Sequence, residues 1–284
     1  HRAHARSFPQ LPERPAGSAA APSGGAPDPG PVRIWAVPEL LKIDPKTGAI
    51  LEQGEAPQHR LHNTVWNGGN STVRLVGSQN EFVAFQLAVE SAGPLRGVEV
   101  SVAVPLFRES ALPAVFRKGG AVQIYREWFV PDDKITASDR PWYADPLIPV
   151  SGPLDIPAHD NAVPGQTVQP FFVDIYIPHD SAPGVHHGAL QVRAANGFRK
   201  TVSVELEVLP LRLPDDLNFV VDLNAYGGVN SGYDIPRGTP EYRKLLQAYH
   251  RVAHIHRANL DILGYSHSGT VEPDQTPLLE GAGA

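Results

Sequence analysis

In the stretch Thr201-Val-Ser-Val-Glu-Leu-Glu-Val-Leu209, apolar and polar residues alternate with a period of two, which is typical of a strand with one face in water. The segment Pro210-Leu-Arg-Leu-Pro214 interrupts this alternation. Beyond it, Asn218-Phe-Val-Val-Asp-Leu-Asn224 has the pattern of a buried strand that ends in polar groups. The sequence therefore predicts a β domain that gives way to a β/α domain near Pro214.

The residues before this stretch repeat the strand pattern several times. Turn-forming residues separate the repeats, and Gly 26 and Pro 29 exceed the share of about 12% that is usual for these two residues. Strands with one apolar face form antiparallel sheets that pack face to face, so the predicted fold class is mainly β, an antiparallel β-sandwich. The predicted strands cover residues 32–37, 72–76, 81–90, 97–104, 121–130, 170–177, 188–194 and 201–209.

Two features of the sandwich are less regular. In the strand at 97–104 we expect four valines to share one face: Val98, Val100, Val102 and Val104. The connection at 131–169 is long and rich in Pro, and it carries Trp142 and Tyr143 without clear periodicity. Long connections are often functional, but this one equally fits an arm whose aromatic residues pack against the next domain.

A helical pattern follows the buried strand. Apolar residues recur at helical spacing within 239–257, with Thr239 as N-cap, Pro240 at the first helical position and Glu241 in the first turn. A short strand is predicted at 259–263. Strand, helix and strand form the unit of a parallel sheet, so the sequence predicts the first β-α-β unit of a (β/α)8 barrel. The apolar stripe of the helix would be exposed unless a partner covers it.

The candidate substrate-binding residues lie at the ends of these two strands. Asp222, Asn224 and the adjoining Tyr226 would face the barrel axis at the carboxyl end of the first strand, where the active sites of such barrels lie. The alternative is that they cap the strand and brace the loop at 227–232. Tyr265 and His267 follow the second strand and would contact a ligand at the same rim, or else belong to a solvated loop.

Composition excludes several classes of protein. The net charge of −6 and the absence of Lys or Arg runs longer than two argue against nucleic-acid binding. No stretch approaches the roughly 18 apolar residues of a membrane span. Cys 0 excludes disulfides, thiolate metal sites and thiol nucleophiles, and Met 0 predicts that His1 is not the translation start. No P-loop, dinucleotide fingerprint or nucleophile elbow is present, so no cofactor is expected.

Histidines and carboxylates occur in pairs, but none of the pairs has the pattern of a metal or catalytic site. His250 and His254 have the spacing of a zinc pair without the accompanying Glu, and the neighbours His186 and His187 would point to opposite faces of a strand, with His179 seven residues before them. The carboxylate pairs are Asp132 with Asp133, Asp215 with Asp216 and Glu205 with Glu207. We expect them to be solvated, and no metal is predicted.

Five segments resemble, in this order, the N-terminal β-sandwich of glycoside hydrolase family 123, in which the sandwich precedes a (β/α)8 barrel. The segments are Asn80-Glu-Phe-Val-Ala-Phe-Gln86, Ala144-Asp-Pro-Leu-Ile-Pro149, Gln169-Pro-Phe-Phe-Val-Asp-Ile-Tyr-Ile-Pro178, Ala182-Pro-Gly-Val-His-His-Gly188 and Leu209-Pro-Leu-Arg-Leu-Pro214. In addition, His254-Ile-His-Arg-Ala-Asn259 is similar to part of the family's first barrel helix. The resemblance covers residues 32–267.

The resemblance implies an exported bacterial glycosidase, secreted, periplasmic or on the cell surface, that acts on N-acetylhexosamine-containing glycans. Characterised members cleave β-N-acetylgalactosaminides by a substrate-assisted mechanism, in which an Asp orients the 2-acetamido group and a neighbouring Glu is the general acid. That pair lies on a later barrel strand and matches no position here, so the catalytic residues are unknown and are expected beyond Ala284. The alternative is a non-catalytic surface or assembly protein that uses the sandwich as an interaction module.

The expected organisation has three parts. Residues 1–31 are rich in Pro, Ala and Gly and are predicted to be a disordered linker, residues 32–213 the sandwich, and residues 214–284 the N-terminal fragment of the barrel domain. The expected partners are a glycan substrate and the remainder of the barrel, supplied either by continuation of the chain or by a second chain. On this reading the chain shown is inactive by itself.

Overall fold

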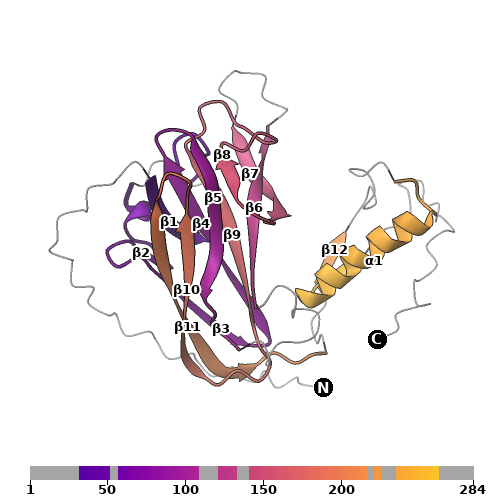
Figure 1. Cartoon of the computed structure of the whole chain (residues 1–284). Helices are drawn as coiled ribbons and strands as arrows, with labels where there is room; N and C mark the ends of the chain where they lie inside the picture. Colours follow the sequence, from indigo (N-terminus) through magenta and orange to yellow (C-terminus); the bar gives the residue numbers. More distant parts are fainter. Residues whose placement is uncertain are drawn as a thin grey trace, which may run out of the picture.

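The structure is a computed structural model that describes residues 32–51, 57–108, 121–132, 141–216, 221–224 and 235–261. Two β-sheets lie face to face, and a small β-α-β unit projects from one side of them (Figure 1). This arrangement agrees with the predicted β-sandwich. The linker predicted at residues 1–31 lies outside the described residues.

The two sheets contain eleven of the strands. The five-stranded sheet has the order β1 (Val32–Pro38), β4 (Glu81–Ser91), β9 (Val168–Ile177), β6 (Val122–Pro131) and β7 (Trp142–Pro149). The six-stranded sheet has the order β2 (Trp66–Asn67), β3 (Thr72–Gln79), β11 (Arg199–Arg212), β10 (Gly184–Arg193), β5 (Leu95–Val104) and β8 (Leu154–Ile156). A 3₁₀ helix, η1 (Pro57–Arg60), precedes β2.

The core lies between the sheets. Alternate side chains of β4, β9, β10 and β11 meet there, because successive residues of a strand point to opposite faces. Burial of one large apolar side chain contributes about 1.5–3 kcal/mol relative to its exposure, so this cluster dominates the stability of the sandwich. Its central members are each at most 3% exposed: Phe85, Leu87, Phe171, Val173, Leu190, Val192, Val204 and Leu206.

One strand pairing departs from the predicted antiparallel order. β11 pairs in parallel with β3, and Ser203 lies opposite Thr72. The six-stranded sheet is therefore mixed, whereas the pairings of the five-stranded sheet are all antiparallel. Alternation within a strand reports which residues are buried but not the direction of a distant neighbour, which explains why the sequence did not reveal this pairing.

The prediction that four valines of β5 share one face was wrong for Val104. Val100 and Val102 lie opposite the core residues Val192 and Leu190, whereas Val104 lies opposite Ala189, beyond a shift in register. Val98 and Val100 are 1% and 5% exposed, but Val102 and Val104 are 40% and 52% exposed. The register against β10 shifts between residues 189 and 190, where β5 contains one extra residue. Such a bulge bends the strand and disrupts the ladder, so one buried face does not continue along the whole of β5.

The long connection at 131–169 also differs from expectation. It contains β7 and β8, which are edge strands of the two sheets. Pro146 and Pro149 interrupt the alternation that would have signalled β7, and an edge strand tolerates proline because one of its sides needs no hydrogen-bonded neighbour. Trp142 packs on a small cluster that includes the buried Phe129, while Tyr143 is 39% exposed.

The segment at 38–51 covers part of the outer face of the five-stranded sheet, the face opposite the core residues Phe85 and Phe171. Gln86 lies on this face and is only 1% exposed, because its amide group donates to the carbonyls of Pro38, Glu39 and Leu41. Next to these residues, the Lys42 ammonium donates to the carbonyl of Ala144 at 2.7 Å. The segment thus reaches from β4 to the edge strand β7.

The β-α-β unit consists of β12 (Asp222–Asn224), α1 (Pro240–Ile255) and β13 (Asn259–Asp261). β12 and β13 are parallel, as predicted for a β-α-β unit. Thr239 caps α1 by accepting from the Tyr242 amide at 3.1 Å, Pro240 occupies the first turn and Glu241 is the acidic residue there, which confirms the predicted helix start. The division of the chain into domains at 213/214 stays a prediction.

Candidate functional site

Because β12 and β13 are parallel, their carboxyl ends lie side by side at the same end of the two-stranded sheet. Asp222 is paired with Asn259, and Asn224 is paired with Asp261. The sequence prediction named the two residues of β12 but missed the two of β13. A usable signal was present, because Asn259 and Asp261 alternate with Leu260 in the same way as Asp222 and Asn224 alternate with Leu223.

Three of the predicted substrate-binding residues cannot be placed at this edge. Tyr226, Tyr265 and His267 lie outside the described residues, as does the loop at 227–232 that the alternative interpretation invoked. The structure therefore brings the predicted positions Asp222 and Asn224 next to β13 and leaves their role as substrate contacts a prediction.

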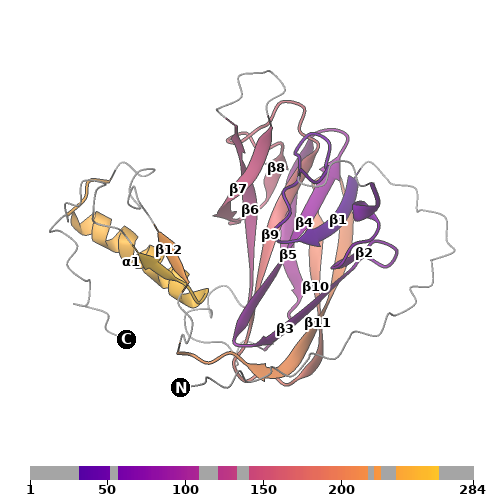
Figure 2. The same cartoon turned by 180° about the vertical axis from the view of Figure 1, so that it is seen from behind.

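A polar junction connects the unit to the sandwich, and only the C-terminal end of α1 approaches the strands (Figures 1 and 2). Asn80, between β3 and β4, is the centre of one half of this junction. Its amide donates to the Leu213 carbonyl at 3.0 Å and to the Asp215 carboxylate at 2.9 Å, and its side-chain oxygen accepts from the Tyr176 hydroxyl at 2.9 Å. Asn80 has φ of 62°, a left-handed conformation that asparagine adopts more readily than most residues.

His256, at the C-cap of α1, is the centre of the other half. Its Nε2 lies 3.0 Å from the carboxylate of Asp174, a buried residue of β9, and its Nδ1 lies 2.9 Å from the Val252 carbonyl. The imidazole also packs on Phe82 of β4, with ring centroids 4.2 Å apart. The hydrogen bond with Asp174 raises the pKa of His256 above its ordinary value, and this effect outweighs the desolvation that lowers it.

Burial and the carboxylates of the junction together raise the pKa values of two nearby tyrosines. Burial raises the pKa of Tyr125, and the negative charge of Asp174 raises it further. Burial likewise raises the pKa of Tyr176, with an added contribution from Asp215. Both phenols therefore stay protonated well above neutral pH. Tyr125 lies opposite Phe172 on the outer face of the five-stranded sheet, the same face that carries Asp174 and Gln86.

Four of the six segments that carry the family resemblance meet at this junction. Asn80 and Phe82 come from the first of them, and Asp174 and Tyr176 come from the third. The fifth segment ends at Pro214, whose carbonyl accepts from the Arg257 guanidinium at 2.7 Å. The helix segment supplies His256 and Arg257. Residues that are scattered along the sequence thus share one structural task, which is to attach the β-α-β unit to the sandwich.

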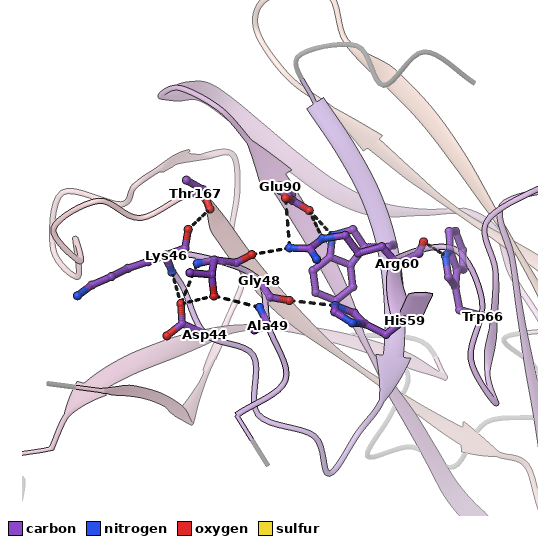
Figure 3. A network of polar contacts seen from close by, with 11 residues as sticks. Asp44, Lys46, Gly48, Ala49, His59, Arg60, Trp66, Glu90 and Thr167 are labelled. Atoms are coloured by element: carbon purple, nitrogen blue, oxygen red, sulfur yellow. Dashed lines mark hydrogen bonds and ion pairs between the residues drawn. The ribbon is translucent and has the colours of Figure 1, made fainter. Parts of the chain in front are cut away.

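A second polar network anchors the segment at 38–51 at its far end (Figure 3). Arg60 donates to Glu90 at 2.9 Å and to the Thr47 carbonyl, and its guanidinium lies over Trp35 at 5.3 Å from the ring centroid. Asp44 accepts from the backbone amides of two following residues, which fixes the turn. These contacts join the segment at 38–51 to η1 and β4, which indicates a structural role for the network.

Glu127 is a buried carboxyl on β6, 3% exposed, and its Oε1 has no hydrogen-bond partner. Burial raises its pKa to about 8; Lys42 opposes this increase and Asp145 adds to it. The segment at 38–51 brings Lys42 into the neighbourhood of Glu127, so the charge environment of this carboxyl depends on that segment.

The paired histidines and carboxylates are distributed over separate surfaces. His186 bonds the Ala182 carbonyl at 2.7 Å, His250 and His254 lie exposed on α1, and His179 contacts Asp180 and Asp215. Glu205 forms an ion pair with Arg74 at 2.7 Å on the outer face of the six-stranded sheet. Within the described part of the chain, no group of three or more such residues is arranged to hold a metal ion. No described helix is long and apolar enough to cross a membrane.

Comparison with solved structures finds a similar fold in a larger enzyme. A family 123 glycoside hydrolase from Clostridium perfringens, studied for its hydrolysis of glycolipid glycans, aligns with a TM-score of 0.59 and 14% identity over 80% of this chain and 37% of the other. The likeness is one of fold. The chain thus spans about a third of the length of that enzyme. No protein-family model matches the sequence, and no curated protein matches it.

Two other solved structures are less similar. The sporulation control protein Spo0M from Bacillus subtilis has a TM-score of 0.27 and 12% identity, over 64% of this chain and 51% of the other. The N-terminal domain of PorA has a TM-score of 0.26 and 13% identity, over 62% and 96%. Neither value supports an argument about this chain.

Proposed function

We propose that this chain is the N-terminal part of an exported glycoside hydrolase that acts on N-acetylhexosamine-containing glycans. In this proposal the sandwich is an accessory domain and the β-α-β unit begins a (β/α)8 catalytic barrel. The carboxylates that perform the chemistry belong to barrel strands that follow Ala284.

The observation that carries the proposal is the parallel β-α-β unit directly after the sandwich, together with the likeness to the family 123 enzyme. That likeness covers 80% of the chain. Residues 1–212 make up about three quarters of the 284 residues, so the aligned region extends past the end of β11. The match therefore supports a shared arrangement of sandwich and following unit, not only a shared sandwich.

Within the proposal, Asp222 and Asn224 contribute to substrate binding. Asn224 stands at the carboxyl end of β12, beside Asp261 of β13, and Asp222 lies two residues before it, opposite Asn259. Barrel enzymes place their active sites at the carboxyl ends of their strands. Carboxylate and amide groups suit the hydroxyl and acetamido groups of an amino sugar, because they provide hydrogen-bond acceptors and donors. Tyr226, Tyr265 and His267 belong to the same proposed rim.

The test uses the polypeptide encoded by the complete gene. It is incubated with the p-nitrophenyl β-glycosides of N-acetylgalactosamine, N-acetylglucosamine and galactose. We expect release of p-nitrophenol from at least one acetamido sugar and none from the galactoside, because a substrate-assisted reaction requires the 2-acetamido group. Absence of hydrolysis from all three, with retained binding to glycans, would favour the non-catalytic alternative.

The role of the rim is tested by Asp222→Asn in the same polypeptide. The substitution removes a charge at the proposed substrate edge, and we expect kcat/KM to fall roughly tenfold or more. The matched control is Asp216→Asn, an exposed residue between β11 and β12, which should leave kcat/KM unchanged. Equal activity of the two variants would remove Asp222 from the proposed site.

A further inference from the structure

Both ring nitrogens of His256 face oxygen atoms that can only accept hydrogen bonds. Nδ1 lies 2.9 Å from the Val252 carbonyl and Nε2 lies 3.0 Å from Asp174 Oδ2. A neutral imidazole has one donor and one acceptor nitrogen, whereas the imidazolium has two donors. The protonated form is therefore the one that satisfies both contacts.

The residues around His256 also favour its protonated form. The Asp174 side chain is 8% exposed, so its charge has little access to water and depends on His256 for compensation. His256 stands at the C-terminus of α1, where the helix dipole favours a cation. Phe82 of β4 contributes an apolar ring, and Tyr125 of β6 is a phenol that stays neutral.

The remaining charged groups near the junction lie on the connecting segments. Arg257 follows His256 and bonds the Pro214 carbonyl, while Asp215 bonds Asn80. Neither of these side chains forms a hydrogen bond or ion pair with the imidazole. The protonation of His256 therefore depends mainly on Asp174.

Loss of the proton changes this contact in a defined way. A neutral His256 can donate to Val252 or to Asp174 but not to both, and the other nitrogen then presents its lone pair to an oxygen. In addition, the buried Asp174 carboxylate loses the cation that compensates it, which is costly in a poorly solvated environment. Both effects weaken the attachment of α1 to β9.

We propose that His256 and Asp174 form a protonation-dependent latch that fixes the C-terminal end of α1 to the outer face of the five-stranded sheet. The latch is closed while His256 carries its proton and opens when the proton is lost. Because the pKa of His256 is raised in the folded state, the contribution of the latch is complete below the ordinary histidine pKa of 6.5 and disappears as the pH rises through the raised value. This inference does not depend on the proposed glycosidase activity.

The first measurement follows the His256 Cε1 proton by NMR as a function of pH. We expect a midpoint above 6.5 in the wild-type chain and a lower midpoint in Asp174→Asn, which removes the partner charge. An unchanged midpoint in Asp174→Asn would contradict the latch. If that variant does not fold, the test rests on the second measurement.

The second measurement reports the position of α1. The chain has Cys 0, so Lys244→Cys on α1 and Ser203→Cys on β11 give two defined spin labels at exposed positions. Pulsed electron resonance should give a narrow distance distribution at about pH 5.5 and a broad one at about pH 9. In His256→Gln, which has no ionisable group, the distribution should be broad at both pH values.

The matched control is His250→Gln, an exposed histidine of the same helix, which should behave as the wild type. Near-ultraviolet circular dichroism verifies that the sandwich stays folded at both pH values. A distribution of equal width at both pH values in the wild type, or a narrow one at both in His256→Gln, would overturn the proposal.

Discussion

The sandwich and the β-α-β unit differ in how they bury apolar surface. The sandwich contains one continuous cluster of buried side chains between its sheets. In the unit, only Ala253 and Ala258 are buried among the side chains described, while Val252 and Leu223 are 58% and 48% exposed. The sandwich therefore has its own hydrophobic core, whereas the unit has an exposed apolar face on which further protein could pack.

The largest expected effect comes from the buried carboxyl of Glu127. Its pKa is raised from 4.5 to about 8, so the folded state holds the proton more tightly than the unfolded state. The free energy of unfolding therefore falls as the pH rises from about 4.5 to about 8, by roughly 4–5 kcal/mol in total, at about 1.4 kcal/mol per pKa unit. Glu127→Gln should abolish this decline and stabilise the chain at pH 9, measured by urea denaturation.

The matched control for that prediction is Glu207→Gln, an exposed glutamate of β11. It should leave the pH dependence of the free energy of unfolding as it is in the wild type. A decline that persists unchanged in Glu127→Gln would show that Glu127 is not the group responsible.

The next effect separates the two regions directly. Phe171→Ala removes a fully buried side chain from the sandwich core and should lower the free energy of unfolding by about 4 kcal/mol, because it leaves a cavity. Val252→Ala removes an exposed side chain from α1 and should cost less than about 0.5 kcal/mol. Urea denaturation monitored by Trp fluorescence measures both. Similar losses of free energy of unfolding in the two variants would contradict the proposed difference in burial between the sandwich and the β-α-β unit.

Arg60→Ala tests the cover over the outer face of the sandwich. The substitution removes the partner of Glu90, both side chains being about four-fifths buried, together with the bond to the Thr47 carbonyl. We expect a loss of about 2 kcal/mol in the free energy of unfolding. Arg60→Lys keeps the charge but not the planar fork, and should recover less than half of the loss. If Arg60→Lys restored the full free energy of unfolding, the positive charge alone would account for the contribution of Arg60.

Thr239→Ala is expected to have the smallest effect, and one confined to the unit. The hydroxyl caps α1, and removal of an N-cap costs about 1 kcal/mol of helix stability. Amide exchange in the first turn of α1 should accelerate severalfold, whereas the urea midpoint of the sandwich should not move. Thr239→Ser, which keeps the capping oxygen, is the control. A shifted midpoint would mean that the two regions unfold together.

Much of the fold could be predicted from the sequence, because local patterns report local burial. The alternation at 81–90 and 201–209 identified β4 and β11, and the Thr239 and Pro240 pair identified the start of α1. The edge strand β7 was missed because its two prolines break the alternation. The parallel pairing of β11 with β3 was missed because it joins residues more than a hundred positions apart, such as Ser203 and Thr72.

The candidate site was predictable only in part. Asp222 and Asn224 follow from the parity of one strand, and their pairing with β13 follows from the β-α-β pattern. The contact of His256 with Asp174, 82 residues apart, has no local signal, since it depends on how α1 lies on the sandwich. The same is true of Glu127: burial raises its pKa, and Lys42, which opposes the increase, precedes it by many residues.

Hydrogen exchange of the whole chain, measured by mass spectrometry on peptides from β9 and α1, is the most direct test of the contrast between the two regions. The account predicts that amides of β9 exchange only through global unfolding, while those of α1 exchange at least about a hundredfold faster through local opening. In a longer polypeptide that continues the barrel, as proposed above, α1 is expected to gain protection. Equal protection of β9 and α1 in the 284-residue chain would contradict the claim that the sandwich is stable by itself and that the β-α-β unit is not.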